Sequence, residues 1–265
     1  MKLSITHTTK YTYDAPVSYG LQQVRLIPSS SKHQTIVNWN IDISGGSKEL
    51  IFEDQYQNQT LLVKADQGAT EVSVKVFGEV DTHCSDGVFG MIYGAAPLWH
   101  FAQSTPRTAA GQGITALAST VGTKINILDG LHALSEAIIE AVPYGKADTF
   151  SGTTAEEALN AGGGVCQDHA QIFVSAARVA GIPARYVSGY LMMNDRVEQD
   201  ASHAWAEAHI DGLGWVGFDV SNGISPDERY VRIATGLDSR DAAPISGLRL
   251  GPASESMIVS VQIQQ

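Results

Sequence analysis

The sequence predicts an α+β fold, in which a β-sandwich-like N-terminal domain precedes a core of helices packed on an antiparallel sheet. Three observations predict it. Segments that alternate polar and apolar residues fill the first third of the chain, helical apolar spacing begins near residue 113, and alternation returns from residue 184. We place the first domain at residues 1–88, and the core with its C-terminal strands at residues 89–265.

The N-terminal domain is predicted from regularly spaced short strands. Each strand alternates at period two and is rich in Val, Ile, Thr and aromatic residues, and turn signals such as "SGGSKE" and "DQGA" separate them. This spacing is typical of antiparallel sandwiches and barrels. The expected strands cover residues 4–13, 22–28, 35–44, 60–66 and 70–80.

The core is predicted from a different pattern. In the expected helix 129–142, apolar residues recur at spacings of three and four, and Pro143 ends the pattern. Thr154 and Glu157 have the spacing of a capping box at the start of a further helix. The remaining expected elements are helices at 113–121 and 166–180 and strands at 184–191, 202–210, 214–220 and 256–264.

Composition restricts the classes of function. The 265 residues are 43% hydrophobic, which supports a packed core, and 28 acidic against 17 basic side chains give a net charge of −11. Because phosphate binding needs a basic surface, we expect no nucleic-acid partner. The opening "MKLSITHTTKYTY" lacks the apolar stretch of a signal peptide, and no run approaches the roughly 20 apolar residues of a membrane helix. We therefore expect a cytoplasmic protein without a membrane partner; no pattern indicates its oligomeric state.

Cys166 begins the expected helix 166–180, directly after three glycines. Ala170, Phe173 and Ala177 share its side of the helix, so the thiol is expected to face the rest of the domain. A helix N-terminus carries partial positive charge that favours a thiolate, and its free N–H groups can stabilise an oxyanion. Free cysteine is also among the residues most often buried in cores. The helix alone leaves a nucleophile and a packing role equally open.

A nucleophilic cysteine needs a histidine, and the histidine needs a group that fixes its tautomer. The register of the hairpin around "DGLG" decides whether His203 and Asp219 can meet. A two-residue loop would put them on opposite faces. A three-residue loop, 211–213, pairs Ile210 with Gly214 and puts Asp219 on the face of His203, within side-chain reach. Gly214 suits the bulge that such loops carry, so we predict the second register.

Other polar residues have alternative interpretations. His169 flanks the face of Cys166 on the helix but has no evident acidic partner, and Asp168 is expected to cap the helix. A zinc cluster of Cys166, His169, His203 and Asp219 is less favoured, because zinc ligands usually come in closely spaced pairs. We expect packing or surface roles for Glu207 and His209, structural roles for Arg185 and Tyr190, and no role in the site for Cys84.

The sequence resembles the bacterial transglutaminase-like family, whose members are expected to be cysteine proteases. The resemblance rests on "GGGVCQDHAQIFVSAARVAGIPARYVSGY", "ASHAWAEAHIDGLGWVGFDVSNG" and the order Cys, His, Asp, and it extends over nearly the whole chain. It implies a papain-like core with Cys166 as nucleophile, His203 as general base and Asp219 as its orienting acid. His169 stands where an aromatic residue is common, and Leu237 and Ser239 replace the arginine and the aromatic residue often found in the closing segment.

This set of residues predicts acyl transfer on an amide or peptide bond through a thioester, with a peptide or protein as substrate. Hydrolysis is the favoured outcome; attack by a second amine would make a cross-linking transglutaminase, and a non-catalytic binding module is the remaining alternative. The backbone N–H of Cys166 is the expected oxyanion donor, with Tyr144 as a weaker candidate. We expect no metal and no organic cofactor. The candidates for lining the substrate cleft are Trp205, Trp215 and His169.

Overall fold

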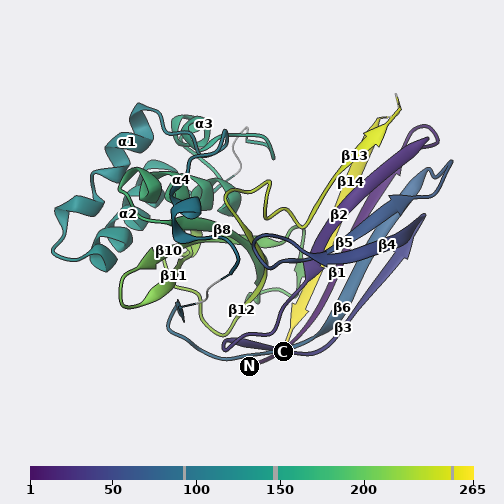
Figure 1. Cartoon of the computed structure of the whole chain (residues 1–265), viewed down its shortest axis with the longest axis horizontal. Helices are drawn as coiled ribbons and strands as arrows, with labels where there is room; N and C mark the ends of the chain where they lie inside the picture. The colour runs from purple at the N-terminus through teal and green to yellow at the C-terminus, as the bar shows by residue number, and fades with distance from the viewer. Residues whose placement is uncertain (92–93, 146–148, 252–253) are drawn as a thin grey trace.

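The computed structural model of the protein describes residues 1–91, 94–145, 149–251 and 254–265. Helices α1 to α4 gather on one side of the molecule, two sheets of long strands form the other, and a third sheet lies beneath the helices (Figure 1). This is the α+β architecture predicted from the sequence. No helix in the described ranges has both the length and the apolar character needed to cross a membrane.

The two sheets of long strands pack face to face as a sandwich. Their shared core contains Val24 and Leu26 from one sheet and Val74 and Val76 from the other, all fully or almost fully buried. One sheet has the order β3-β6-β1-β14-β9 and the other β13-β2-β5-β4. The strands are β1 (Lys2–Tyr13), β2 (Tyr19–Ile27), β3 (Gln34–Ser44), β4 (Gly46–Glu53), β5 (Gln59–Ala65), β6 (Glu71–Thr82), β9 (Glu198–Gln199), β13 (Ile245–Leu250) and β14 (Glu255–Gln264).

The sandwich takes strands from both ends of the chain. β14 pairs with β1 along its whole length, from Ser4 opposite Gln264 to Tyr13 opposite Glu255, and β13 pairs with β2. Figure 1 shows these last strands among the first ones. Our division at residue 88 assigned them to the core. They join the sandwich because β1 and β2 offer free edges whose N–H and C=O groups need partners.

The core is a five-stranded sheet covered by helices on one face. Ala206 and Ala208 of the central strand and Ala176 and Ala177 of α4 are fully buried in one cluster, since small side chains let helix and sheet approach closely. The sheet order is β12-β8-β10-β11-β7. Its strands are β7 (Val88–Gly90), β8 (Ala184–Leu191), β10 (His203–Ile210), β11 (Gly214–Phe218) and β12 (Tyr230–Gly236). The helices are α1 (Gln112–Ala118), α2 (Ile127–Ala141), α3 (Ala155–Ala161) and α4 (Cys166–Val179), with short 3-10 turns η1 (Leu98–Ala102), η2 (Val121–Thr123) and η3 (Val220–Asn222).

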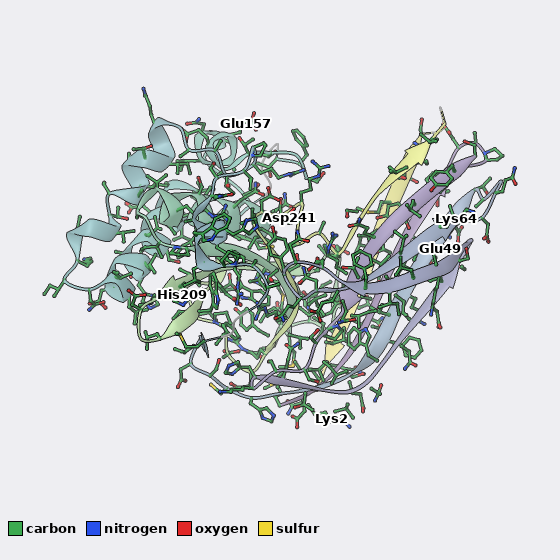
Figure 2. All side chains as sticks on the ribbon, viewed as in Figure 1. Lys2, Glu49, Lys64, Glu157, His209 and Asp241 are labelled. Atoms are coloured by element: carbon green, nitrogen blue, oxygen red, sulfur yellow. The ribbon has the colours of Figure 1, made fainter. Side chains whose placement is uncertain are left out.

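Loops of the sandwich contact the core directly. The Tyr56 hydroxyl, between β4 and β5, donates a 2.8 Å hydrogen bond to Asp241, which Figure 2 labels where the two halves meet. Asn58 exchanges two 2.8 Å hydrogen bonds with the backbone of Thr235 in β12. The sandwich is therefore attached to the core sheet on the face that the helices leave open.

Candidate active site

Cys166 is the first residue of α4, as the sequence predicts, and it is half-buried. The Asp168 carboxylate accepts hydrogen bonds from the Val165 backbone N–H (3.0 Å) and the Thr149 hydroxyl (2.9 Å), which fixes the chain just before the cysteine. A Cβ at Gly164 would lie 2.9 Å from the Asp168 Cβ, so the third glycine is needed for this approach. The predicted capping role of Asp168 is confirmed.

The hairpin after His203 has the predicted register. Ile210 pairs with Gly214 across a three-residue loop. Gly214 has a φ of +80°, and a Cβ there would lie 2.3 Å from the backbone of Gly90, so a side chain would be excluded on both counts. With this register Asp219, directly after β11, lies on the face of His203.

His203 lies between both expected partners. Its Nε2 is hydrogen-bonded to Asp219 Oδ2 at 2.6 Å, and Cys166 lies close enough to the ring to affect the pKa of His203. Because Asp219 occupies Nε2, the Nδ1 side of the ring is left for the thiol. Burial opposes a charged imidazole, but the hydrogen bond to Asp219 and the charges of Cys166 and Asp219 outweigh it and raise the pKa of His203 to about 10.

Asp219 is a fully buried carboxylate that four donors satisfy. Besides His203, it accepts hydrogen bonds from the Tyr230 hydroxyl (2.7 Å), the Asn222 side-chain amide (2.7 Å) and the Asn222 backbone N–H (3.3 Å). Burial raises the pKa of this carboxyl, yet the donors, His203 first among them, hold it below its usual value. Asp219 therefore carries its negative charge without contact with water.

Tyr230 and Asn222 were missed in the sequence. Asn222 had a signal, because Asp is among the preferred N-cap residues, and the Asp219 carboxylate caps η3 by accepting a hydrogen bond from the Asn222 backbone N–H. Tyr230 had none. It comes from β12, two strands away from His203, and only the strand order brings it to the carboxylate.

Two family models match the chain. Residues 115–220, which include Cys166, His203 and Asp219, match the transglutaminase-like superfamily, and residues 3–81 match the bacterial transglutaminase-like N-terminal region. The chain therefore has a transglutaminase-like core, preceded by the N-terminal region of bacterial transglutaminase-like proteins. The first matched segment spans α4 and the site hairpin, and the second spans the strands β1 to β6 of the sandwich.

Individual proteins are also similar to this chain. An uncharacterized protein of Mycobacterium leprae is 27% identical over 279 residues, which covers 99% of this chain and 98% of that protein. An uncharacterized protein of Mycobacterium tuberculosis is 32% identical over 147 residues, or 52% of this chain and 46% of that protein. The crystal structure of a Cytophaga hutchinsonii protein, provisionally named a cysteine protease, superposes with a TM-score of 0.79 over 100% of this chain and 91% of that one, at 23% identity. This last likeness is one of fold.

Tyr144 lies beside the transglutaminase-like site. It forms an isolated β-bridge with Gly164, next to the start of α4, and its side chain is 61% exposed. Partial burial raises the pKa of Tyr144, and the charges of Cys166 and Asp219 raise it further, so its hydroxyl stays a donor at neutral pH. The position is compatible with the oxyanion role predicted for it.

The three residues predicted to line the cleft are all buried. Trp205 is 1% exposed and its ring packs against His203 and Tyr230, so it backs the imidazole. Trp215 is 1% exposed and lies under Arg185. His169 is fully buried, with Nδ1 2.8 Å from the Ser221 hydroxyl and Nε2 2.7 Å from the Val142 carbonyl oxygen. Each of the three side chains therefore offers little surface to a substrate in this structure, and their role in lining the substrate cleft stays a prediction.

The structure also places the residues for which the sequence analysis considered other roles. His169 is held by uncharged partners, and burial lowers its pKa, so it is a neutral structural group. In the described part of the chain no group of three or more His, Cys, Asp or Glu residues has a metal-binding arrangement. Glu207 forms a buried ion pair with Arg185, as a structural role requires, and Tyr190 donates to or accepts from His7 at 2.8 Å. Cys84 is exposed in a loop outside the site.

Proposed function

We propose that the protein is a cysteine-dependent enzyme that transfers the acyl group of an amide or peptide bond, with water as the favoured acceptor. The observation that carries the proposal is the position of His203. One ring nitrogen lies 2.6 Å from the buried Asp219 carboxylate, and the ring is close enough to Cys166, at a helix N-terminus, for the cysteine to raise the pKa of His203. A nucleophile, a base and an orienting acid in this order are what thiol acyl transfer requires.

The first half of the reaction forms a thioester. His203, whose pKa is raised to about 10, holds the proton given up by the Cys166 thiol, and the thiolate sulfur attacks the carbonyl carbon of the amide. The backbone N–H of Cys166 lies in the first turn of α4, where no intrahelical acceptor exists, and it can donate to the developing oxyanion together with Tyr144. The C–N bond then breaks as the imidazolium returns the proton to the leaving nitrogen.

The second half releases the product. Water attacks the thioester carbon while His203 removes its proton, and the proton passes to the sulfur as the carboxylic acid leaves. Asp219 keeps its charge throughout and holds the ring with Nε2 toward itself. The provisional name of the Cytophaga hutchinsonii protein, a cysteine protease, agrees with hydrolysis. A peptide or protein substrate and a cytoplasmic location stay predictions from the sequence.

Peptide cleavage measured by mass spectrometry tests the proposal. A mixed peptide library is incubated with the wild-type protein, with Cys166→Ala and with the control Cys84→Ala, each with and without a labelled primary amine. We expect cleavage products with wild type and Cys84→Ala and none with Cys166→Ala. Incorporation of the amine in place of cleavage would identify a transglutaminase, and no Cys166-dependent product under either condition would favour a binding module.

A further inference from the structure

A cavity of about 220 Å³ lies between the sandwich and the core sheet. It is on the face of the sheet opposite α4, because Arg185 pairs with Glu207 on β10 while the neighbouring Ala206 and Ala208 pack under the helices. Sandwich loops around residues 29–34 and 55–58 line one part of it, and residues between 94 and 101 line another. The core contributes Arg185, Trp215 and residues 232–235.

The charge of this cavity is unbalanced. Its lining contains two arginines, Arg185 and Arg232, and no Asp or Glu. Glu207 lies beneath them, and one of its oxygens, Oε2, serves both: it is 2.6 Å from Arg185 Nε, 2.5 Å from Arg185 Nη2 and 3.5 Å from Arg232 Nη2. Two positive charges therefore share one carboxylate. Burial and the neighbouring Arg232 lower the pKa of Arg185 to about 9 in spite of Glu207, as expected where positive charge is in excess.

Donors of both guanidinium groups remain unused. Within the described ranges, no protein atom accepts a hydrogen bond from Arg185 Nη1 or from any nitrogen of the Arg232 side chain. The nearby acids have other partners, since Asp54 pairs with Arg25 at 3.3 Å and Asp241 accepts from Tyr56. A guanidinium is a planar fork suited to a carboxylate or phosphate.

The geometry of Arg185 is fixed by packing. The Arg185 guanidinium lies 3.8 Å from the centre of the Trp215 ring, and Arg185 is only 5% exposed. Phe101 packs edge-on against the same tryptophan at 5.1 Å. Polar donors are thus combined with an apolar wall, to which Leu98 and Ile233 also contribute.

We propose that this cavity binds a small organic anion, with a carboxylate held by Arg232 and Arg185 and an apolar body against Trp215 and Phe101. The volume is below the roughly 300–1,000 Å³ of pockets for drug-sized ligands, so the ligand is of amino-acid size. Glu207 and His203 are four residues apart on β10, or roughly 13 Å along the strand. The anion site is therefore separate from Cys166 and does not depend on the proposed reaction.

Calorimetric titration at pH 7.5 tests the site with three probes: 3-phenylpropionate, its uncharged amide and inorganic phosphate. We expect saturable binding of the carboxylate and none of the amide. Arg232→Gln, at a partly exposed position, should weaken binding of the carboxylate by at least about tenfold, because it removes a charged donor. Arg196→Gln, which makes the same charge change at an exposed position outside the cavity, should bind as wild type.

Tryptophan fluorescence gives a second measure of binding, and thermal melts show whether each variant is folded. Trp215 fluorescence should change on titration with the carboxylate, and Trp215→Phe should lose that signal. Thermal melts of each variant confirm that it folds before it is titrated. The proposal is overturned if the carboxylate shows no saturation up to about 10 mM, if the amide binds equally, if phosphate binds and the carboxylate does not, or if a folded Arg232→Gln retains wild-type affinity.

Discussion

The Tyr230 hydroxyl donates a 2.7 Å hydrogen bond to Asp219, although Tyr230 is in β12, Asp219 directly follows β11, and β8 and β10 lie between these two strands. The centre of the Tyr230 ring lies 6.0 Å from the centre of the His203 ring and 5.4 Å from that of the Trp205 ring. Tyr230 thus fixes the carboxylate and covers the imidazole at the same time. This makes it a positioning residue of the proposed site.

Tyr230→Phe tests that role. The substitution removes one donor from a buried carboxylate, so we expect the pKa of Asp219 to rise and the acid limb of kcat/KM against pH to move to higher pH. The free energy of unfolding should fall by about 1–3 kcal/mol, the cost of losing a hydrogen bond to a charged group. The pH profile and urea unfolding measure the two effects.

Tyr190→Phe is the matched control. It removes a buried tyrosine hydroxyl that contacts His7 at 2.8 Å, away from Cys166. We expect a comparable loss of stability with an unchanged pH profile. If both variants lose stability and neither moves the acid limb, Tyr230 is only a packing residue.

Thiol labelling separates a reactive cysteine from an accessible one. Cys84 is exposed and Cys166 half-buried, so access alone would make Cys84 react faster. The backbone N–H of Asp86 favours the Cys84 thiolate, but desolvation and the carboxylates of Asp86 and Glu228 raise the pKa of Cys84. We expect iodoacetamide at pH 7 to label Cys166 at least about tenfold faster than Cys84. Peptide mapping measures the labelling of each cysteine. His203→Ala should remove this preference, and faster labelling of Cys84 in the wild type would contradict the site.

Asp219→Asn should change both the rate and its pH dependence. The carboxylate stabilises the imidazolium of His203, whose pKa is raised to about 10; without it that pKa falls. Since His203 must carry a proton to the leaving nitrogen, the alkaline limb of kcat/KM should move from near pH 10 to lower pH by at least about one unit. The rate at its optimum should fall by roughly 10²- to 10⁴-fold.

The same substitution has a stability signature. A folded pKa above the unfolded value of His203 contributes stability that is complete below about pH 6.5 and is lost as pH rises through about 10. Urea unfolding between pH 7 and 10 should show this decline in the wild type and a smaller one in Asp219→Asn. Asp211→Asn, in the exposed hairpin loop, is the control for the charge change and should follow the wild type.

Local rules were sufficient for the parts of the site that lie close together in sequence. Turn chemistry and strand alternation predicted the pairing of Ile210 with Gly214, and helix periodicity and the glycine run predicted Cys166 as the first residue of α4. What they could not predict was which side chains other elements cover. His169 and Trp205 looked free to line a cleft because nothing local shows that Ser221, Val142 and Tyr230 occupy their contacts.

Long-range pairing was equally hidden in the fold. Alternation predicted β14 as a strand but not that its partner is β1, at the other end of the chain. β4 and β13 were missed because their exposed residues give no clear alternation. β12 was missed too, and with it Tyr230, since a strand buried on both faces lacks the period of two.

We expect the buried His7 to make the stability of the fold depend on pH in the acid range. It is 1% exposed in β1, with Nδ1 2.8 Å from the Tyr190 hydroxyl of β8, so it joins sandwich to core. Burial lowers the pKa of His7 to about 4. The unfolded chain, with an ordinary value near 6.5, then binds a proton that the folded chain rejects. Stability contributed by the neutral ring is therefore present above pH 6.5 and is lost between about pH 6.5 and 4, by up to about 3 kcal/mol.

Urea unfolding of His7→Gln tests this expectation. The variant cannot titrate at this position, so its stability should be lower at pH 7.5 but should decline less as the pH falls. His83→Gln, at an exposed position, should keep the wild-type slope. A decline as steep in His7→Gln as in the wild type would assign the acid sensitivity to other groups.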